Sequence, residues 1–159
     1  KAPVAAPVVE EARFVVFFLD GVRWAVPIED VLEMGTVPRI TPLPNVPGFV
    51  RGVTNLRGEV LAVIDLRAVL GFEPGSDPSR ERMLVVRAPG REAVGGFIVD
   101  GVRGLARLAP GSMAPPSLPA GERVGQFLRG VSGHDGALLN VLETRTLFDT
   151  PEMLKLAAG

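Results

Sequence analysis

The sequence predicts a mainly β protein made of two similar, closely packed halves, and three observations support this. A twenty-residue segment occurs twice, at 51–70 and at 129–148, as in a duplicated structural unit. Nineteen glycines and fifteen prolines separate short apolar runs, which is typical of many short strands and turns. The 159 residues, 47% hydrophobic and 22% charged, suit one globular domain or two small ones that pack intimately.

The two copies share a framework but differ in the central turn. Seven pairs are identical: Arg51/Arg129, Gly52/Gly130, Val53/Val131, Gly58/Gly136, Leu61/Leu139, Val63/Val141 and Arg67/Arg145. The turn reads Asn55-Leu56-Arg57 in the first copy and Gly133-His134-Asp135 in the second. We therefore expect the shared residues to build the fold and the unshared ones to carry the function. A second echo, LDGVR at 19–23 and VDGVR at 99–103, suggests an Asp-Gly turn in each half.

The first half opens with a predicted hairpin. Residues 1–12 are expected to form a flexible lead-in or a linker from a larger protein. Aromatic and β-branched runs at 14–19 and 22–26 flank Asp20-Gly21, a pair that suits a two-residue turn. Apolar positions 28, 31 and 32 recur at helical spacing after a proline and before a glycine. They predict a short helix of two turns.

The repeated unit supplies the next elements. Four prolines within 37–48 exclude a central strand and predict an extended surface connection. Residues 49–55 and 59–64 are predicted to pair around the turn at 56–58. A short helix over 66–70 is expected to follow, with Asp65 as its N-cap and Gly71 at its end.

A polar, turn-rich stretch at 71–82 separates the halves, and the second half repeats the pattern. The expected elements are strands 83–87, 92–99 and 102–108, turns at Pro89-Gly90 and Asp100-Gly101, a Pro/Gly-rich connection at 110–121, and the second copy of the unit. The approximate halves are 13–72 and 82–149, with a C-terminal tail at 153–159 and exchange of a strand between halves left open. Two packed barrels are the preferred architecture, because closure removes exposed sheet edges.

Composition argues against several classes of function. The chain has no cysteine and a single histidine, His134, so we expect no metal, no cofactor and no thiol chemistry. Ser132 lies outside any Gly-x-Ser-x-Gly motif, and no phosphate-binding loop is present, so an enzyme is not expected. A net charge of −1 argues against nucleic acid, and no apolar run approaches a membrane span. Absence of cysteine fits a cytoplasmic protein.

The turn of the first copy is the candidate binding site. Leu56 and Arg57 are not needed for folding, since the second copy uses His134 and Asp135 there. An exposed arginine is usually only a solvated charge. An apolar residue beside an arginine at a turn is, however, the pairing enriched in protein interfaces, which favours a binding function.

The segment 49–70, FVRGVTNLRGEVLAVIDLRAVL, closely resembles the signature of the CheW family of bacterial chemotaxis coupling proteins. In that family a similar Gly-Val-x-Asn-Leu-Arg-Gly run precedes a strand and an Ile-Asp-Leu-Arg helix start. Segments 14–27, 98–102 and 127–131 also fall in the family's order and spacing. The resemblance extends over residues 13–152.

The resemblance implies two packed five-stranded, SH3-like β-barrels with a few short helices. It implies a cytoplasmic, non-catalytic adaptor, monomeric in isolation and recruited to receptor arrays. Its partners would be the tip of a methyl-accepting chemoreceptor and the regulatory domain of a CheA-type histidine kinase. The receptor-binding residues carried over are Val31, Glu33, Gly52, Asn55, Leu56, Arg57 and Gly58. The kinase-binding positions are Gly101 and Gly130, although packing or backbone geometry explains Val31 and the glycines equally well.

Two alternatives stay open. The chain would be the regulatory domain of a CheA-type kinase if histidine-kinase sequence precedes it in the full gene product. It would be a small hydrolase or ligand-binding barrel if a deep polar pocket held converging carboxylates.

Overall fold

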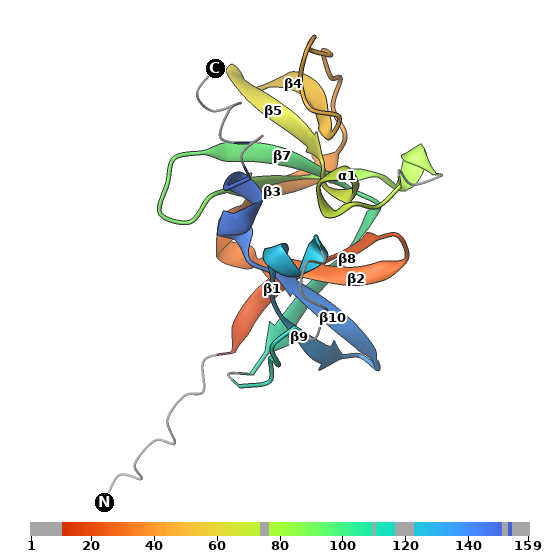
Figure 1. Ribbon diagram of the computed structural model, residues 1–159, viewed down its shortest axis with the longest axis vertical. Helices are drawn as coiled ribbons and strands as arrows, with labels where there is room; N and C mark the ends of the chain where they lie inside the picture. The colour runs from red at the N-terminus through yellow and green to blue at the C-terminus, as the bar shows by residue number, and fades with distance from the viewer. Residues whose placement is uncertain (1–10, 74–76, 110, 117–122, 151–152, 154–159) are drawn as a thin grey trace, which may run out of the picture.

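The computed structural model describes residues 11–73, 77–109, 111–116, 123–150 and 153, and this part of the chain is mainly β (Figure 1). The described residues form the strands β1 (Ala12–Leu19), β2 (Val22–Pro27), β3 (Val31–Thr36), β4 (Val50–Leu56), β5 (Glu59–Asp65), β6 (Arg82–Arg87), β7 (Val94–Val99), β8 (Gly101–Leu108), β9 (Leu128–His134) and β10 (Ala137–Leu142). Short helices connect them: α1 (Leu66–Leu70) and the 3₁₀ helices η1 (Ile28–Asp30), η2 (Pro78–Arg80), η3 (Val124–Phe127) and η4 (Thr144–Phe148). Most of the predicted lead-in and tail lies outside the described residues, and so does part of the connection predicted at 110–121. Two of their residues belong to the fold instead: Ala12 begins β1, and Met153 is buried in the central core.

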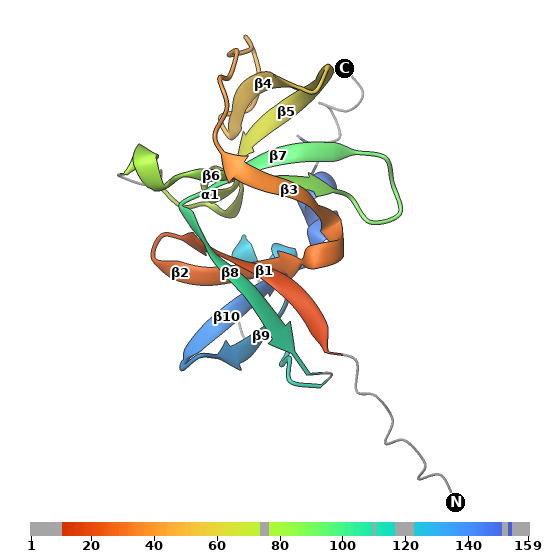
Figure 2. The ribbon, with the colours of Figure 1, turned by 180° about the vertical axis from the view of Figure 1, so that it is seen from behind.

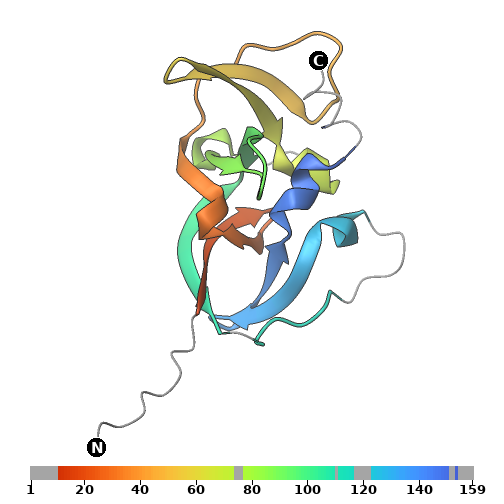
Figure 3. The same ribbon diagram turned by 90° about the vertical axis from the view of Figure 1, so that its left-hand side faces the viewer.

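The strands form two five-stranded sheets, which confirms the predicted fold class. Sheet A has the order β8-β1-β2-β10-β9, and sheet B has the order β3-β6-β7-β5-β4. The two sheets lie one above the other (Figures 1 and 3). Each duplicated hairpin, β4–β5 or β9–β10, therefore takes the same place at one end of its own sheet.

Each sheet takes strands from both halves of the sequence. The β1–β2 hairpin joins β8, β9 and β10, and the β6–β7 hairpin joins β3, β4 and β5. β2 runs parallel to β10 and β7 runs parallel to β5, while the other pairs are antiparallel. The chain crosses between the sheets at η1 and again at Asp100, as the rear view shows (Figure 2).

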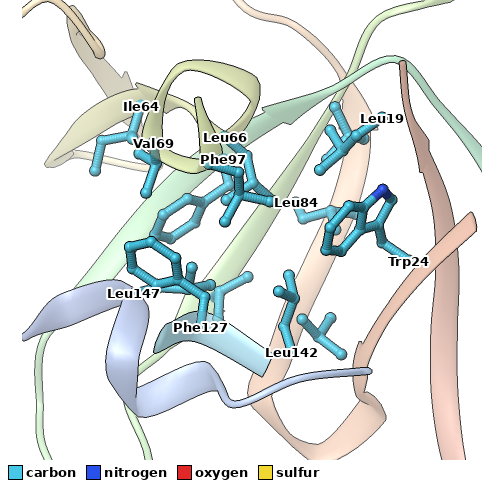
Figure 4. Close-up of a cluster of buried hydrophobic side chains, with 14 of the residues drawn as sticks. Leu19, Trp24, Ile64, Leu66, Val69, Leu84, Phe97, Phe127, Leu142 and Leu147 are labelled. Carbon is cyan, nitrogen blue, oxygen red and sulfur yellow. The ribbon is translucent and has the colours of Figure 1, made fainter. Parts of the chain in front are cut away.

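Apolar side chains form three clusters, and the largest lies between the sheets. Alternation along β1 shows why: Phe14 and Val16 face the interior of sheet A, while Val15 and Phe17 face sheet B. Figure 4 shows this central cluster, with Trp24 from sheet A and Leu84 and Phe97 from sheet B packed together. Each sheet also curls around a smaller cluster of its own, so that it forms a small barrel. The shared central core makes the two barrels one body.

The short helix predicted after Pro27 was wrong in extent. One 3₁₀ turn, η1, is followed at once by β3, because β3 pairs with β6 and this tertiary pairing overrides local spacing. The apolar spacing has another cause. Ile28 and Val31 both pack against the central core, and Leu32 is a bulged, exposed residue of an edge strand.

The second Asp-Gly echo also proved to be misleading. Asp20-Gly21 is the predicted two-residue hairpin turn, with φ of +52° and +75°. Asp100-Gly101, by contrast, lies where the chain leaves β7 in sheet B and enters β8 in sheet A. No hairpin forms there, because β8 pairs with β1 and not with β7.

The predicted helix 66–70 is confirmed together with its ends. The Asp65 carboxylate accepts a hydrogen bond from the backbone N–H of Arg67 at 3.0 Å, and Gly71 closes the helix with φ of +91°. The Arg67 side chain is completely buried and bonds both carboxylate oxygens of Asp65, at 2.8 and 2.9 Å. It also reaches Glu81 at 2.6 Å and Asp100 at 2.7 Å. Asp100 accepts in turn from the Asp20 N–H at 2.7 Å, so this network joins sheet B to the β1–β2 turn of sheet A.

Candidate functional site

The candidate site is the tip of the β4–β5 hairpin. Leu56 ends β4 and pairs with Glu59, so that Arg57 and Gly58 form a two-residue turn with φ of +52° and +86°. The side chain of Asn55 accepts a hydrogen bond from the Gly58 N–H at 2.9 Å, which explains the asparagine at this position. The turn therefore contains Arg57 and Gly58, and Leu56 belongs to the strand.

Two predicted site residues come together at this tip. Arg57 forms an ion pair with Glu33 of β3, and its side chain is still 77% exposed. β3 and β4 are the two edges of sheet B, so the pair spans the open side of the barrel. Leu56 is half-buried and packs against the interior cluster of sheet B. Arg57, not Leu56, is the side chain that the hairpin tip presents to solvent.

Val31 lies apart from the tip. It is half-buried at the start of β3 and packs against the central core. Packing in the core is the alternative explanation already given for this residue.

Gly52 and its duplicate Gly130 allow close backbone contacts. A Cβ on Gly52 would lie 2.1 Å from the carbonyl oxygen of Thr41, and one on Gly130 would lie 2.6 Å from that of Ala114. Those two partners each form an isolated bridge beside the hairpin, Thr41 to Val53 and Ala114 to Val131. The glycines are therefore explained by packing in both copies.

Gly101 differs from these two glycines. A Cβ there would make ordinary contacts with Arg80 and Phe18 at 3.7 and 3.9 Å, and its φ is not in the left-handed region. Neither crowding nor backbone geometry requires glycine at this position, so its assignment to kinase binding stays a prediction.

The second copy builds the same turn with opposite charge. Asp135 and Gly136 replace Arg57 and Gly58, with φ of +50° and +75°. Arg103, the bulged residue of edge strand β8, lies 3.7 Å from the Asp135 carboxylate. His134 Nε2 lies 3.5 Å from the same carboxylate. Both barrels thus carry an ion pair from an edge strand to a hairpin turn, and the acidic and basic partners are exchanged.

A second pair of equivalent ion pairs keeps its polarity. Arg51 and Arg129 occupy the bulge of their hairpins and contact Asp65 and Glu143 at 3.3 and 3.1 Å. Because both copies retain these contacts, they belong to the common framework.

One surface feature beside the tip was missed by the sequence reasoning. Val60 on β5 and its duplicate Leu138 on β10 are 74% and 67% exposed. Val60 borders a shallow groove whose lining includes Arg39, Val53 and Asn55. Strict alternation along β5, with Leu61 and Val63 buried, would have revealed the exposed position.

The described part of the chain shows no group of three or more acidic, histidine or cysteine side chains positioned for a metal ion. Nor is any helix within those ranges long and apolar enough to cross a membrane.

Comparison with known proteins gives one consistent result. The family model for the CheW-like domain matches residues 13–152. Protein FrzA of Myxococcus xanthus is 35% identical, covering 97% of this chain and 96% of its own length. A probable chemotaxis protein CheW of Rhizobium etli is 30% identical, covering 89% and 90%. The crystal structure of the scaffolding protein TtCheW from Thermoanaerobacter tengcongensis has a TM-score of 0.79 and 27% identity, covering 89% of this chain and 95% of that one. The chain belongs to the CheW-like domain family.

Proposed function

We propose that this protein is a non-catalytic adaptor that couples a methyl-accepting chemoreceptor to a CheA-type histidine kinase. The observation that carries the proposal is the family signature turn, which presents Arg57 with 77% of its side chain exposed. Val60, also largely exposed, lies on the adjoining strand. An exposed arginine beside an apolar side chain is suited to anchor a protein partner.

The receptor tip is assigned to sheet B. Arg57 and Glu33 offer charges of both signs, Asn55 and Gly58 hold the turn in shape, and Gly52 admits the Thr41 carbonyl beside the hairpin. Leu56 supports the turn from its half-buried position, and Val31, which lies apart from the tip against the central core, is retained as a receptor contact at the start of β3. The resulting surface contacts the helical receptor tip through Arg57 and is kept rigid from below.

The kinase is assigned to the positions carried over from the family, Gly101 and Gly130. Both lie in sheet A, in β8 and β9. The signature turn and the kinase-binding positions therefore lie on different barrels.

Coupling follows from the way the barrels are joined. The central core contains residues of both sheets, and the Arg67 network adds polar contacts from sheet B to the β1–β2 turn of sheet A. A partner bound to one barrel therefore fixes the orientation of a partner on the other. Receptor conformation alters kinase activity through the difference in these contacts. In the cell the adaptor is cytoplasmic and joins receptor arrays.

The test is the affinity of a purified chemoreceptor cytoplasmic fragment for the Arg57→Ala variant. Loss of this anchor is expected to weaken binding by about 1–3 kcal/mol while circular dichroism stays unchanged. Arg145→Ala is the matched control, because this arginine is exposed in the second copy. Unchanged affinity in Arg57→Ala with an intact fold would remove the assignment.

The second candidate is the regulatory domain of a CheA-type kinase, which has the same fold. The identity of the relatives favours the adaptor, since the chain is 35% identical to FrzA and 30% identical to a probable chemotaxis protein CheW of Rhizobium etli. Sequencing the gene upstream of Lys1 distinguishes the two. Histidine-kinase catalytic sequence there would decide for the kinase domain.

A further inference from the structure

Two arginines lie directly opposite each other on neighbouring strands of sheet A. The β1–β8 register pairs Arg13 with Arg107, and both side chains are exposed. Two residues further along, Val15 pairs with Leu105, so Leu105 lies on the same face of the sheet as the arginines. Leu105 is 55% exposed. An apolar residue therefore adjoins two positive charges on one surface, the Arg13–Leu105–Arg107 stripe.

This arrangement costs stability. Like charges directly opposite in an antiparallel pair repel, because their Cβ atoms are about 5 Å apart. Within the described ranges neither guanidinium contacts a carboxylate. Arg51 and Arg129 in the hairpins, by contrast, each have an acidic partner. Arg13 and Arg107 thus keep two positive charges together without an ion pair to any described carboxylate.

The stripe borders the junction between the barrels. Val15 belongs to the central core, so this face of sheet A is the one that faces sheet B. Edge strand β3 of sheet B lies on the same side as β8, as Figures 2 and 3 show, and carries exposed Met34. The β4–β5 turn and the start of β1 lie on one side of the molecule, at opposite ends (Figures 1 and 3). A partner lying along this side can meet Arg57 at one end and the stripe at the other.

We propose that the Arg13–Leu105–Arg107 stripe binds an acidic, helical segment of the receptor. Two carboxylates one turn apart on a helix are about 5–6 Å apart, which matches the spacing of an opposed pair on adjacent strands. An apolar side chain next to them on the helix contacts Leu105. The inference rests on the proposed function and adds a second, electrostatic contact at a distance from the signature turn.

The experiment measures binding of a chemoreceptor cytoplasmic fragment at about 20 mM and about 300 mM salt. The charge-reversed variant R13E/R107E is compared with R87E/R145E, which changes net charge equally at two other exposed arginines. At low salt the first should bind about 10-fold more weakly, and the second within about twofold of the unmodified protein. High salt should shrink this difference, because the contacts are exposed.

A single substitution separates binding from folding. Arg107→Glu places a carboxylate opposite Arg13 and replaces repulsion with attraction, so the free energy of unfolding should rise slightly. Receptor binding should fall in the same variant. A rise in stability with unchanged binding would overturn the proposal.

Other results would also contradict the proposal that the stripe binds the receptor. Equal weakening by R13E/R107E and R87E/R145E would show a general charge effect. Loss of binding to vesicles containing about 30% phosphatidylglycerol, with receptor affinity unchanged, would assign the stripe to anionic lipid. Failure of the unmodified protein to bind the receptor fragment would refute the proposed function itself. If only Arg57→Ala weakens binding, the proposed function stands and the stripe proposal fails.

Discussion

The two duplicated hairpins have the same backbone and different surfaces. Each has a bulged arginine paired with an acidic residue, a glycine that admits a neighbouring carbonyl, and a two-residue turn with positive φ. At the turn, however, the first copy presents Arg57 against Glu33, and the second presents Asp135 against Arg103. Folding requires the turn geometry and tolerates either polarity. The sign of the charge is therefore free to serve recognition.

A later pair of the repeat shows the opposite case, in which identical residues have different surroundings. Arg67 and Arg145 are identical in sequence, yet Arg67 is completely buried among carboxylates while Arg145 is exposed. At the other crossover, η1, a hydroxyl takes the place of the arginine: the Thr144 hydroxyl donates to the buried Asp30 carboxylate at 2.7 Å. Identity between repeats therefore does not guarantee an identical role.

The largest expected effect on the free energy of unfolding comes from replacing the buried Arg67, compared with replacing its exposed duplicate Arg145. Arg67→Ala leaves Asp65, Glu81 and Asp100 close together without their cation, and should lower the free energy of unfolding by about 3–5 kcal/mol. Arg145→Ala should change it by less than about 0.5 kcal/mol. Urea titration of both variants measures the contrast. Similar losses in the two would contradict the role given to burial.

A smaller loss is expected from crowding at the hairpin bulge. Gly52→Ala places Cβ 2.1 Å from the Thr41 carbonyl oxygen, at a φ of +143°, and should destabilise the protein by about 2–3 kcal/mol. Gly133→Ala is the control, since no heavy atom lies within 4 Å of the added Cβ. Thermal unfolding of both variants provides the measurement. Equal melting temperatures would show that Thr41 can move aside without cost.

Acid is expected to lower the free energy of unfolding of the protein through protonation of Asp65 in the first copy of the repeat. Burial alone raises the pKa of Asp65, but the hydrogen bonds and charge of Arg67, aided by Arg51, hold that pKa below its ordinary value of 3.8. A depressed carboxyl pKa stabilises the fold at neutral pH, and this contribution is lost as pH falls below about 4. The stability difference between the unmodified protein and Asp65→Asn should stay constant from about pH 5 to about pH 8 and shrink in acid. A difference that persists at low pH would show that charge is not involved.

Most of the fold could be predicted from the sequence because local signals and tertiary pairing agree there. Alternating apolar runs and the Asp20-Gly21 turn gave the first hairpin, and the Asp65 cap with Gly71 gave α1. Prediction failed at residues 28–36 and 100–101, where the chain crosses between sheets. Pairing of β3 with β6 and of β8 with β1 decides those segments, and no local pattern reports a distant partner strand.

The candidate site, too, could be predicted only in part from the sequence. The duplication pointed to residues 55–57 because they differ between the copies. It could not show that Arg57 reaches Glu33, since the two are brought together by the curvature of sheet B. Nor could it show that Leu56 is half-buried and that Val60, on the adjoining strand, is the exposed apolar residue.

The most direct test gives the first hairpin the polarity of the second. The double variant E33R/R57D retains an ion pair between β3 and the turn, so the free energy of unfolding should change by less than about 1 kcal/mol. Affinity for a chemoreceptor cytoplasmic fragment, measured by calorimetry, should nevertheless fall at least about 10-fold, because the exposed charge has the wrong sign. A folded E33R/R57D variant that binds the receptor fragment as tightly as the unmodified protein would contradict the claim that recognition depends on the charge at this turn.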